Sequence, residues 1–140
     1  MRKENILYLV IPCYNEELVL KETTKRLREK FDELIKKKVI SKKSKVLYVN
    51  DGSKDKTWEL IESINKEDNT FVGISLSRNR GHQNALVAGL LTAKEYADVV
   101  ISMDADLQDD INAMDEMLEK YLNGADIVYG VRNKRDKDTF

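Results

Sequence analysis

Two aspartates and a glutamine occupy alternate positions, Asp104, Asp106 and Gln108, directly after an apolar run over residues 98–103. In an extended segment, residues two apart point to the same side, so two carboxylates and an amide oxygen would face one point. Such oxygen ligands suit a hard divalent cation, Mg²⁺ or Mn²⁺, and two carboxylates leave coordination positions for phosphate oxygens. A bound cation would also offset the repulsion among the acids of MDADLQDD. The pattern indicates either a divalent metal site or a solvated acidic turn that caps the following helix.

The elements that must position these side chains alternate along the chain. Strands are expected at residues 6–12, 45–50, 71–77, 98–103 and 125–131, where short apolar runs end at polar or turn-forming residues. Amphipathic stretches predict helices at residues 16–38 and 82–96, one after Asp55, and one from about Ile111 to a stop at Gly124. Asn15 and Asp55 are the expected caps of the first two helices. This alternation predicts one α/β domain, 1–140, with a mainly parallel sheet flanked by helices.

Composition narrows the class of protein. A chain of 140 residues, 41% apolar and 35% charged, is typical of one soluble globular domain. The 24 basic and 25 acidic residues give a net charge of −1, which gives no indication of nucleic-acid binding. No apolar run approaches the ~20 residues that span a bilayer, and the N-terminus does not have the pattern of a secretory signal. The single cysteine, Cys13, suits a reducing cytoplasm and is expected to be a small apolar side chain at a strand end.

The residues that follow the expected strands are polar or charged. Ligands of open α/β sheets bind beyond the carboxyl ends of the strands, so these segments should meet at one edge. They are PCYNEE (12–17), NDGS (50–53), SRNRGH (77–82), DADLQ (104–108) and Arg132. Their convergence is more informative than any one of them. This convergence is compatible with both an enzyme and a binding module. The sequence contains neither a G-x-G-x-x-G motif after the first strand, which a dinucleotide-binding oxidoreductase would have, nor a P-loop.

Each of these residues also has a purely structural interpretation. Asp51 lies in a turn, where it either forms an Asx-type turn or hydrogen-bonds a ribose or base. Glu16 and Glu17 favour a helix N-terminus. Arg78, Arg80 and Arg132 are either surface charges or bidentate partners of a diphosphate. His82 is expected to be structural or to orient a substrate, because the sequence holds no second histidine for a metal site.

Five motifs together resemble a known family. They are IPCYNEE (11–17), VNDGSKDKT (49–57), LSRNRGHQNALVAGL (76–90), MDADLQDD (103–110) and VYGVR (128–132). In this order they are similar to the family 2 glycosyltransferases of the GT-A fold. The branch they resemble most comprises dolichol-phosphate mannose synthase-like enzymes and bacterial polyprenyl-phosphate glycosyltransferases. The motifs extend over nearly the whole chain, and their combination is far more specific than any one of them.

The resemblance implies a Rossmann-like GT-A domain that binds a nucleotide sugar. Asp104, Asp106 and Gln108 would hold Mg²⁺ or Mn²⁺ against the donor diphosphate. Arg132 would contact a phosphate and, with the two aspartates, form the catalytic set. The nucleotide-sugar contacts implied by the motifs are Pro12, Tyr14, Asn15, Glu16, Asp51, Ser53, Arg78, Gly81, Asp104, Ala105 and Asp106.

The resemblance also implies a reaction. A UDP- or GDP-sugar would donate its sugar to a polyprenyl phosphate at the cytoplasmic face of the membrane, with inversion at the anomeric carbon. Metal and arginine would stabilise the negative charge on the leaving nucleoside diphosphate. The transition state would have oxocarbenium character, by analogy with glycoside chemistry. The anionic acceptor would need no general base.

Members of this family continue well past VYGVR with an acceptor-side half and, in many bacterial members, membrane helices. We therefore expect this chain to be the N-terminal part of a longer protein. Only the full-length protein would then associate with the membrane. On that expectation the alternative function is a nucleotide-sugar-binding module without transfer activity of its own. Apolar surface exposed at the edge of such a fragment would favour a homodimer.

Overall fold

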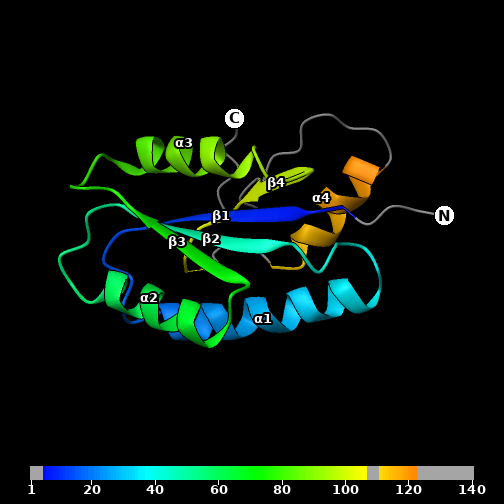
Figure 1. The fold of residues 1–140 in the computed structure, drawn as a ribbon, viewed down its shortest axis with the longest axis horizontal. Helices are drawn as coiled ribbons and strands as arrows, with labels where there is room; N and C mark the ends of the chain where they lie inside the picture. Colours follow the sequence, from blue (N-terminus) through cyan, green and yellow to red (C-terminus); the bar gives the residue numbers. More distant parts are fainter. Residues whose placement is uncertain (1–4, 107–110, 123–140) are drawn as a thin grey trace.

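A computed structural model describes residues 5–106 and 111–122 of the chain (Figure 1). These residues form four strands and four helices that alternate in the sequence. The elements are β1 (Leu7–Cys13), α1 (Leu20–Lys36), β2 (Lys45–Asn50), α2 (Thr57–Glu67), β3 (Phe71–Ser75), α3 (His82–Ala93), β4 (Val99–Ser102) and α4 (Ala113–Leu122). The predicted fifth strand, the helix stop at Gly124, Gln108 and Arg132 lie outside the described residues.

The strands form one parallel sheet in the order β3-β2-β1-β4, which confirms the predicted α/β class. β1 lies between β2 and β4. After β3 the chain crosses to the other side of β1, where it forms β4. The strand ends are in register: Cys13 pairs with Asn50, and Asn50 pairs with Ser75. The loops that follow all the strands therefore start at one edge of the sheet, as the sequence analysis expected.

Alternate strand residues point to two different cores. On one face, Leu9 and Tyr48 pack in the larger hydrophobic cluster, to which α1, α2 and α4 contribute apolar side chains. On the other face, Val10 and Val49 pack in a smaller cluster beneath α3. Figure 1 shows α1 and α2 below the sheet and α3 above it. Cys13 is buried in the larger cluster, and burial raises the pKa of its thiol, which fits the expected apolar role.

Small residues bring α3 close to the sheet. A Cβ atom at Gly89 would lie 2.4 Å from Val10 Cγ1 and 2.9 Å from Val49 Cγ2, so only glycine fits without a shift. Ala85 and Ala93, one turn away on either side, are buried on the same stripe. The opposite side of α3 exposes Val87, Leu90 and Leu91.

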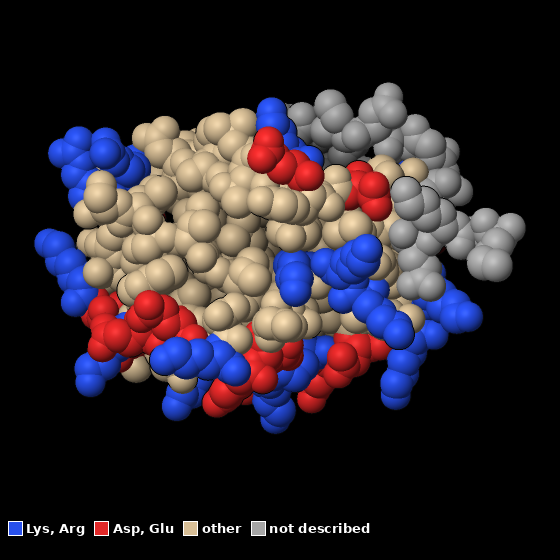
Figure 2. All heavy atoms as spheres, viewed as in Figure 1, with Lys and Arg blue, Asp and Glu red and all other residues tan. Residues whose placement is uncertain are grey.

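Charge is distributed unevenly around this framework. Figure 2 shows charged side chains gathered over α1 and α2, whereas the surface around α3 is largely uncharged. No residue of α3 is Asp, Glu, Lys or Arg. The homodimer expected from exposed apolar surface stays a prediction. Among the helices in the described ranges, none has both the length and the apolar character needed to cross a bilayer.

Two expected helix starts differ from the structure. The first helix begins at Leu20 rather than Glu16, and its N-cap is Val19, which makes no side-chain capping bond. The prediction of Asn15 as its cap is therefore wrong. The N-cap of α2 is Lys56, but Asp55 Oδ1 accepts the backbone N–H of Thr57 at 2.9 Å. Asp55 therefore stabilises the first turn of α2 as the expected cap would, although it lies one residue before the N-cap position.

Candidate active site

The loops after β1 and β2 are joined by reciprocal hydrogen bonds. The backbone N–H of Asn15 donates to Ser53 Oγ at 2.9 Å, and the N–H of Lys54 donates to Asn15 Oδ1 at 2.8 Å. Asn15 has a φ of 53°, a left-handed conformation that asparagine tolerates better than most residues. Ser53 N–H in turn donates to Asn50 Oδ1 at 3.2 Å. The two predicted site residues, Asn15 and Ser53, are thereby held side by side.

The same pair of loops fixes Glu16. Its backbone N–H donates to Thr57 Oγ1 at 2.8 Å, and that of Glu17 donates to Asp55 Oδ2 at 3.3 Å. Both residues precede the first residue of α1, and these bonds hold them against the loop that leads into α2. Partial burial raises the pKa of Asp55, but hydrogen bonds from Thr57 and from the Glu17 backbone outweigh it and leave that pKa below its ordinary value.

Replacing Asp55 with alanine is expected to lower the free energy of unfolding by about 1 kcal/mol at pH 7, the usual cost of losing a helix-start acceptor. Because the pKa of Asp55 is lower in the folded state, its contribution is complete above the unfolded value of about 4. It is lost as pH falls through the folded value. Urea unfolding of wild type and variant at pH 7 and in acid measures the difference. A gap that stays constant into strong acid would contradict this assignment.

Asp51 holds the third loop, which follows β3. Its side chain is only 3% exposed, with Oδ1 accepting the N–H of Arg80 at 2.7 Å and Oδ2 accepting that of Gly81 at 3.1 Å. The neighbouring Gly52 has a φ of +68°, and a Cβ there would lie 2.3 Å from the backbone nitrogen of Asn79. Glycine at 52 therefore lets the third loop lie directly on the second. Sequence reasoning did not foresee this structural role of Asp51.

The segment with the two aspartates is held from α1. Thr23 Oγ1 donates to the carbonyl of Ala105 at 2.5 Å, and Ala105 lies in the larger hydrophobic core. With that side chain buried, Ala105 offers only its backbone to a ligand. Of its two neighbours in the sequence, Asp104 is partly buried and Asp106 is exposed.

His82 faces this segment from the start of α3. Its Nε2 atom lies 3.7 Å from Asp104 Oδ1, with the imidazole 60% exposed. From the sequence, His82 was expected to be structural or to orient a substrate, and it was not among the predicted site residues. Because α3 begins at the edge of the sheet where β4 ends, the fold brings His82 to the aspartates.

The pKa of Glu16 indicates that several carboxylates lie close together at this edge of the sheet. Burial raises the pKa of Glu16, and the negative charges of Asp106, Asp104 and Asp55 raise it further. Carboxylates from the loops after β1, β2 and β4 therefore share one region of negative potential. Such a region favours a bound cation, because the ion removes the repulsion that otherwise opposes ionisation.

The described residues alone do not form a complete metal site. Residues 5–106 and 111–122 contain no group of three or more His, Cys, Asp or Glu side chains that could hold a metal ion. Asp104 and Asp106 supply two carboxylates, the hard oxygen ligands that Mg²⁺ and Mn²⁺ prefer. The donor set fits an ion that completes its coordination with water and substrate phosphates, as these ions commonly do.

The remaining predicted residues lie around this cluster. Pro12 is buried at the end of β1, and Tyr14 is 42% exposed in the loop that follows. Arg78 is exposed in the third loop, and its backbone lies against Gly52 of the second loop. The predictions for Gln108 and Arg132 concern residues outside the described ranges.

Two solved structures share this architecture. The mannosyltransferase PcManGT from Pyrobaculum calidifontis, in complex with GDP-Man and Mn²⁺, matches 74% of this chain and 28% of its own with a TM-score of 0.57 and 20% identity. S. aureus TarS residues 1–349, in complex with UDP, matches 80% of this chain and 32% of its own with a TM-score of 0.55 and 22% identity. The parallel sheet with helices on both faces is the GT-A fold, as predicted.

Sequence relatives agree with the fold. The uncharacterized glycosyltransferase YkoT of Bacillus subtilis (strain 168) is 49% identical over 139 residues, 99% of this chain and 41% of YkoT. The prophage bactoprenol glucosyl transferase homolog of Escherichia coli (strain K12) is 38% identical over 130 residues, 93% of this chain and 40% of that protein. The chain thus spans about two fifths of the length of these relatives. The family model of glycosyl transferase family 2 matches residues 8–140, and the chain belongs to that family.

Proposed function

We propose that this chain is the donor-binding domain of a metal-dependent, inverting glycosyltransferase that transfers a sugar from a UDP- or GDP-sugar to a polyprenyl phosphate. The observation that carries the proposal is the gathering of Glu16, Asp104 and Asp106 at the carboxyl edge of the sheet. Ligands of open α/β sheets bind at this edge. Further support comes from a relative named as a bactoprenol glucosyl transferase homolog and from neighbours solved with GDP-Man and Mn²⁺ or with UDP.

Asp104 and Asp106, with Gln108 as a third oxygen ligand, would hold Mg²⁺ or Mn²⁺. When bound, the ion would act as a Lewis acid that stabilises negative charge on the leaving nucleoside diphosphate. Arg78 and Arg132 would neutralise the same diphosphate through bidentate contacts. Together with the two aspartates, Arg132 forms the proposed catalytic set.

The nucleoside would lie against the joined loops after β1 and β2. Tyr14 and Asn15 would contact it from the first loop, with Pro12 at the end of β1, and Asp51 and Ser53 would contact it from the second loop. Because the loops are hydrogen-bonded to each other, they need little reorganisation on binding. The polyprenyl phosphate acceptor is already anionic and would attack without a general base. It would be presented at the cytoplasmic face of the membrane.

A second candidate is a nucleotide-sugar-binding module that does not transfer sugar by itself. It is favoured by one observation, that the chain spans about two fifths of the length of its relatives. The two candidates share the donor site. They differ in whether this chain, without further sequence, delivers sugar to an acceptor.

Calorimetric titration of UDP and GDP into this chain tests the shared donor site. With Mn²⁺ present we expect one nucleotide to bind, and with a chelator we expect its affinity to fall at least about tenfold. UMP and GMP, which lack the second phosphate, should show a much smaller dependence on Mn²⁺. Equal affinity with Mn²⁺ and with chelator would contradict the metal assignment, and binding of neither nucleotide would contradict the donor site. Incubation with labelled sugar nucleotide and polyprenyl phosphate then separates enzyme from binding module.

A further inference from the structure

Helix α1 has two buried threonines, and their hydroxyls have different partners. Thr23 and Thr24 are each 3% exposed. The hydroxyl of Thr24 shares a hydrogen bond of 2.7 Å with the hydroxyl of Tyr48 in the core. The hydroxyl of Thr23 donates to the backbone carbonyl of Ala105 at 2.5 Å. Of the two bonds, the one from Thr23 reaches the segment that carries the two aspartates.

The Thr23 bond differs from the usual hydrogen bond of a threonine inside a helix. Such a hydroxyl commonly donates to the carbonyl four residues earlier in the same helix. Thr92 of α3 does so, with the carbonyl of Ala88 as its acceptor at 2.9 Å. Thr23 instead donates to a carbonyl 82 residues away in the sequence. Its hydroxyl therefore holds another segment of the chain rather than its own helix.

The aspartate segment is held on both sides of Asp104. The N–H of Met103 donates to a carbonyl of β1 at 3.1 Å, and Thr23 holds the carbonyl of Ala105. Met103 and Ala105 are buried in the larger core, whereas Asp104 between them is partly exposed. The alternate burial of a strand thus continues past the end of β4. Asp104 is therefore directed away from that core, toward His82 of α3.

The bond to the Ala105 carbonyl also affects Asp106. The carbonyl of Ala105 and the N–H of Asp106 belong to one planar peptide group. Holding the oxygen therefore limits rotation of this plane, and with it the direction in which the chain enters Asp106. Without the Thr23 hydroxyl the carbonyl would lose a buried partner, and turning toward another donor would rotate the plane. The bond thus acts on both aspartates through the residue between them.

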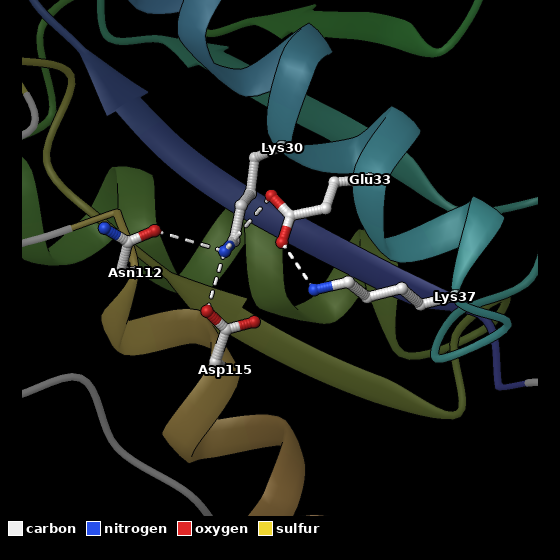
Figure 3. Close-up of polar contacts among 5 residues, drawn as sticks. All are labelled: Lys30, Glu33, Lys37, Asn112 and Asp115. Carbon is white, nitrogen blue, oxygen red and sulfur yellow. Dashed lines mark hydrogen bonds and ion pairs between the residues drawn. The ribbon is translucent and has the colours of Figure 1, made fainter.

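The helix that carries Thr23 is itself held in place. Lys30, about two turns further along α1, is 5% exposed, and its ammonium donates to Asp115 Oδ2 at 2.7 Å and to Asn112 Oδ1 at 3.2 Å (Figure 3). A buried ammonium is costly unless it is paired, and these two partners pair it. Apolar side chains of α1 add contacts within the larger core. Thr23 therefore donates its hydrogen bond from a fixed helix.

We propose that Thr23 is a positioning residue that keeps the carboxylates of Asp104 and Asp106 in the geometry needed to bind a divalent cation, by fixing the peptide group between Ala105 and Asp106. Metal-binding side chains must be held within about half an ångström of the productive geometry, and such support comes from residues behind the ligands. Thr23 touches neither cation nor nucleotide in this role. The inference rests on the proposed function, because it concerns the metal of the donor site.

The test measures binding of UDP and GDP by calorimetry as Mn²⁺ is varied. Thr23→Val removes the hydroxyl and keeps the branched shape, whereas Thr23→Ser keeps the hydroxyl and removes a methyl group. We expect Thr23→Val to raise the Mn²⁺ concentration for half-maximal binding by about 10-fold or more, the usual effect of losing a residue that supports a metal ligand. Its affinity in chelator should not change, and Thr23→Ser should keep the wild-type Mn²⁺ response.

Thr24→Val is the matched control. It also removes a buried threonine hydroxyl from α1, but the partner that it loses is Tyr48. We expect Thr24→Val to lower the urea concentration at the midpoint of unfolding, as Thr23→Val and Thr23→Ser should also do. The Mn²⁺ response of Thr24→Val should match that of wild type. The comparison therefore separates an effect on stability from an effect on the metal site.

Three results would overturn the positioning role. One is a wild-type Mn²⁺ response in Thr23→Val, and another is an equal shift in Thr24→Val. The third is an equal loss of binding with Mn²⁺ and with chelator, which a merely structural role produces. If Thr23→Val does not fold, Thr23→Ala decides, because alanine puts no methyl group in the place of the hydroxyl. A wild type with no Mn²⁺ response at all contradicts the proposed metal site, and the positioning role with it.

Discussion

Replacing Asp106 with asparagine is expected to weaken Mn²⁺-dependent binding of the nucleoside diphosphate by at least about 100-fold and leave the fold intact. Asparagine keeps the shape of the side chain but removes the charge that attracts the cation. Residues that only support metal ligands already cost 10–100-fold when replaced, so a ligand should cost more. Asp106 is exposed, so its replacement disturbs no core packing. Asp104→Asn should behave in the same way, and calorimetry with Mn²⁺ and with chelator measures both.

The control for this experiment is Asp32→Asn, an equal change of charge on the exposed side of α1. Asp32 lies 12 residues after the first residue of α1, about 18 Å along the helix and away from the site. It should leave binding unchanged. Wild-type affinity in both Asp104→Asn and Asp106→Asn would reject the metal site.

The fold was largely predictable because hydrophobic periodicity reports which residues are buried. The apolar runs gave the four described strands to within two residues at either end, and their alternation with helices gave the parallel sheet. The start of α1 was predicted too early, because amphipathic periodicity reports which residues face the core and not the residue at which the helical backbone begins. The bonds of the Glu16 and Glu17 amides to Thr57 and Asp55, about 40 residues away, could not be predicted from a local pattern either.

The location of the site could be predicted from the sequence, but the residues that hold it in place could not. Parallel strands bring their carboxyl ends together, so Asp51, Asp104 and Glu16 could be assigned to one edge from the sequence. Thr23, which holds the aspartate segment, and the buried Lys30 were both missed. A signal for them did exist, because both fall on the apolar stripe of α1 with Leu27 and Leu34, where a polar residue needs a buried partner. Those partners lie on distant segments, which only the fold shows.

Asp51 holds the third loop and is proposed to contact the nucleoside, and its replacement tests both roles. In Asp51→Ala, the amide of Arg80 loses its acceptor and that of Gly81 keeps only Asn79 Oδ1, so the free energy of unfolding should fall by about 2 kcal/mol. If Asp51 also contacts the nucleoside, affinity for UDP or GDP should fall by about 10- to 100-fold, the usual effect of losing a charged hydrogen bond. The loss should be the same with Mn²⁺ and with chelator, because the nucleoside lies apart from the metal. Urea unfolding and calorimetry measure the two effects.

Asp68→Ala separates the structural role of Asp51 from its role in binding. Asp68 also binds a backbone amide, that of Thr70 at 2.9 Å, and the guanidinium of Arg28 at 3.0 Å. It precedes β3 and so lies at the opposite edge of the sheet from the site. Its replacement should lower stability without changing nucleotide affinity. If Asp51→Ala behaves like Asp68→Ala, Asp51 only holds the third loop. If Asp51→Ala weakens binding only when Mn²⁺ is present, Asp51 acts on the metal side of the ligand, and the nucleoside contact is wrong.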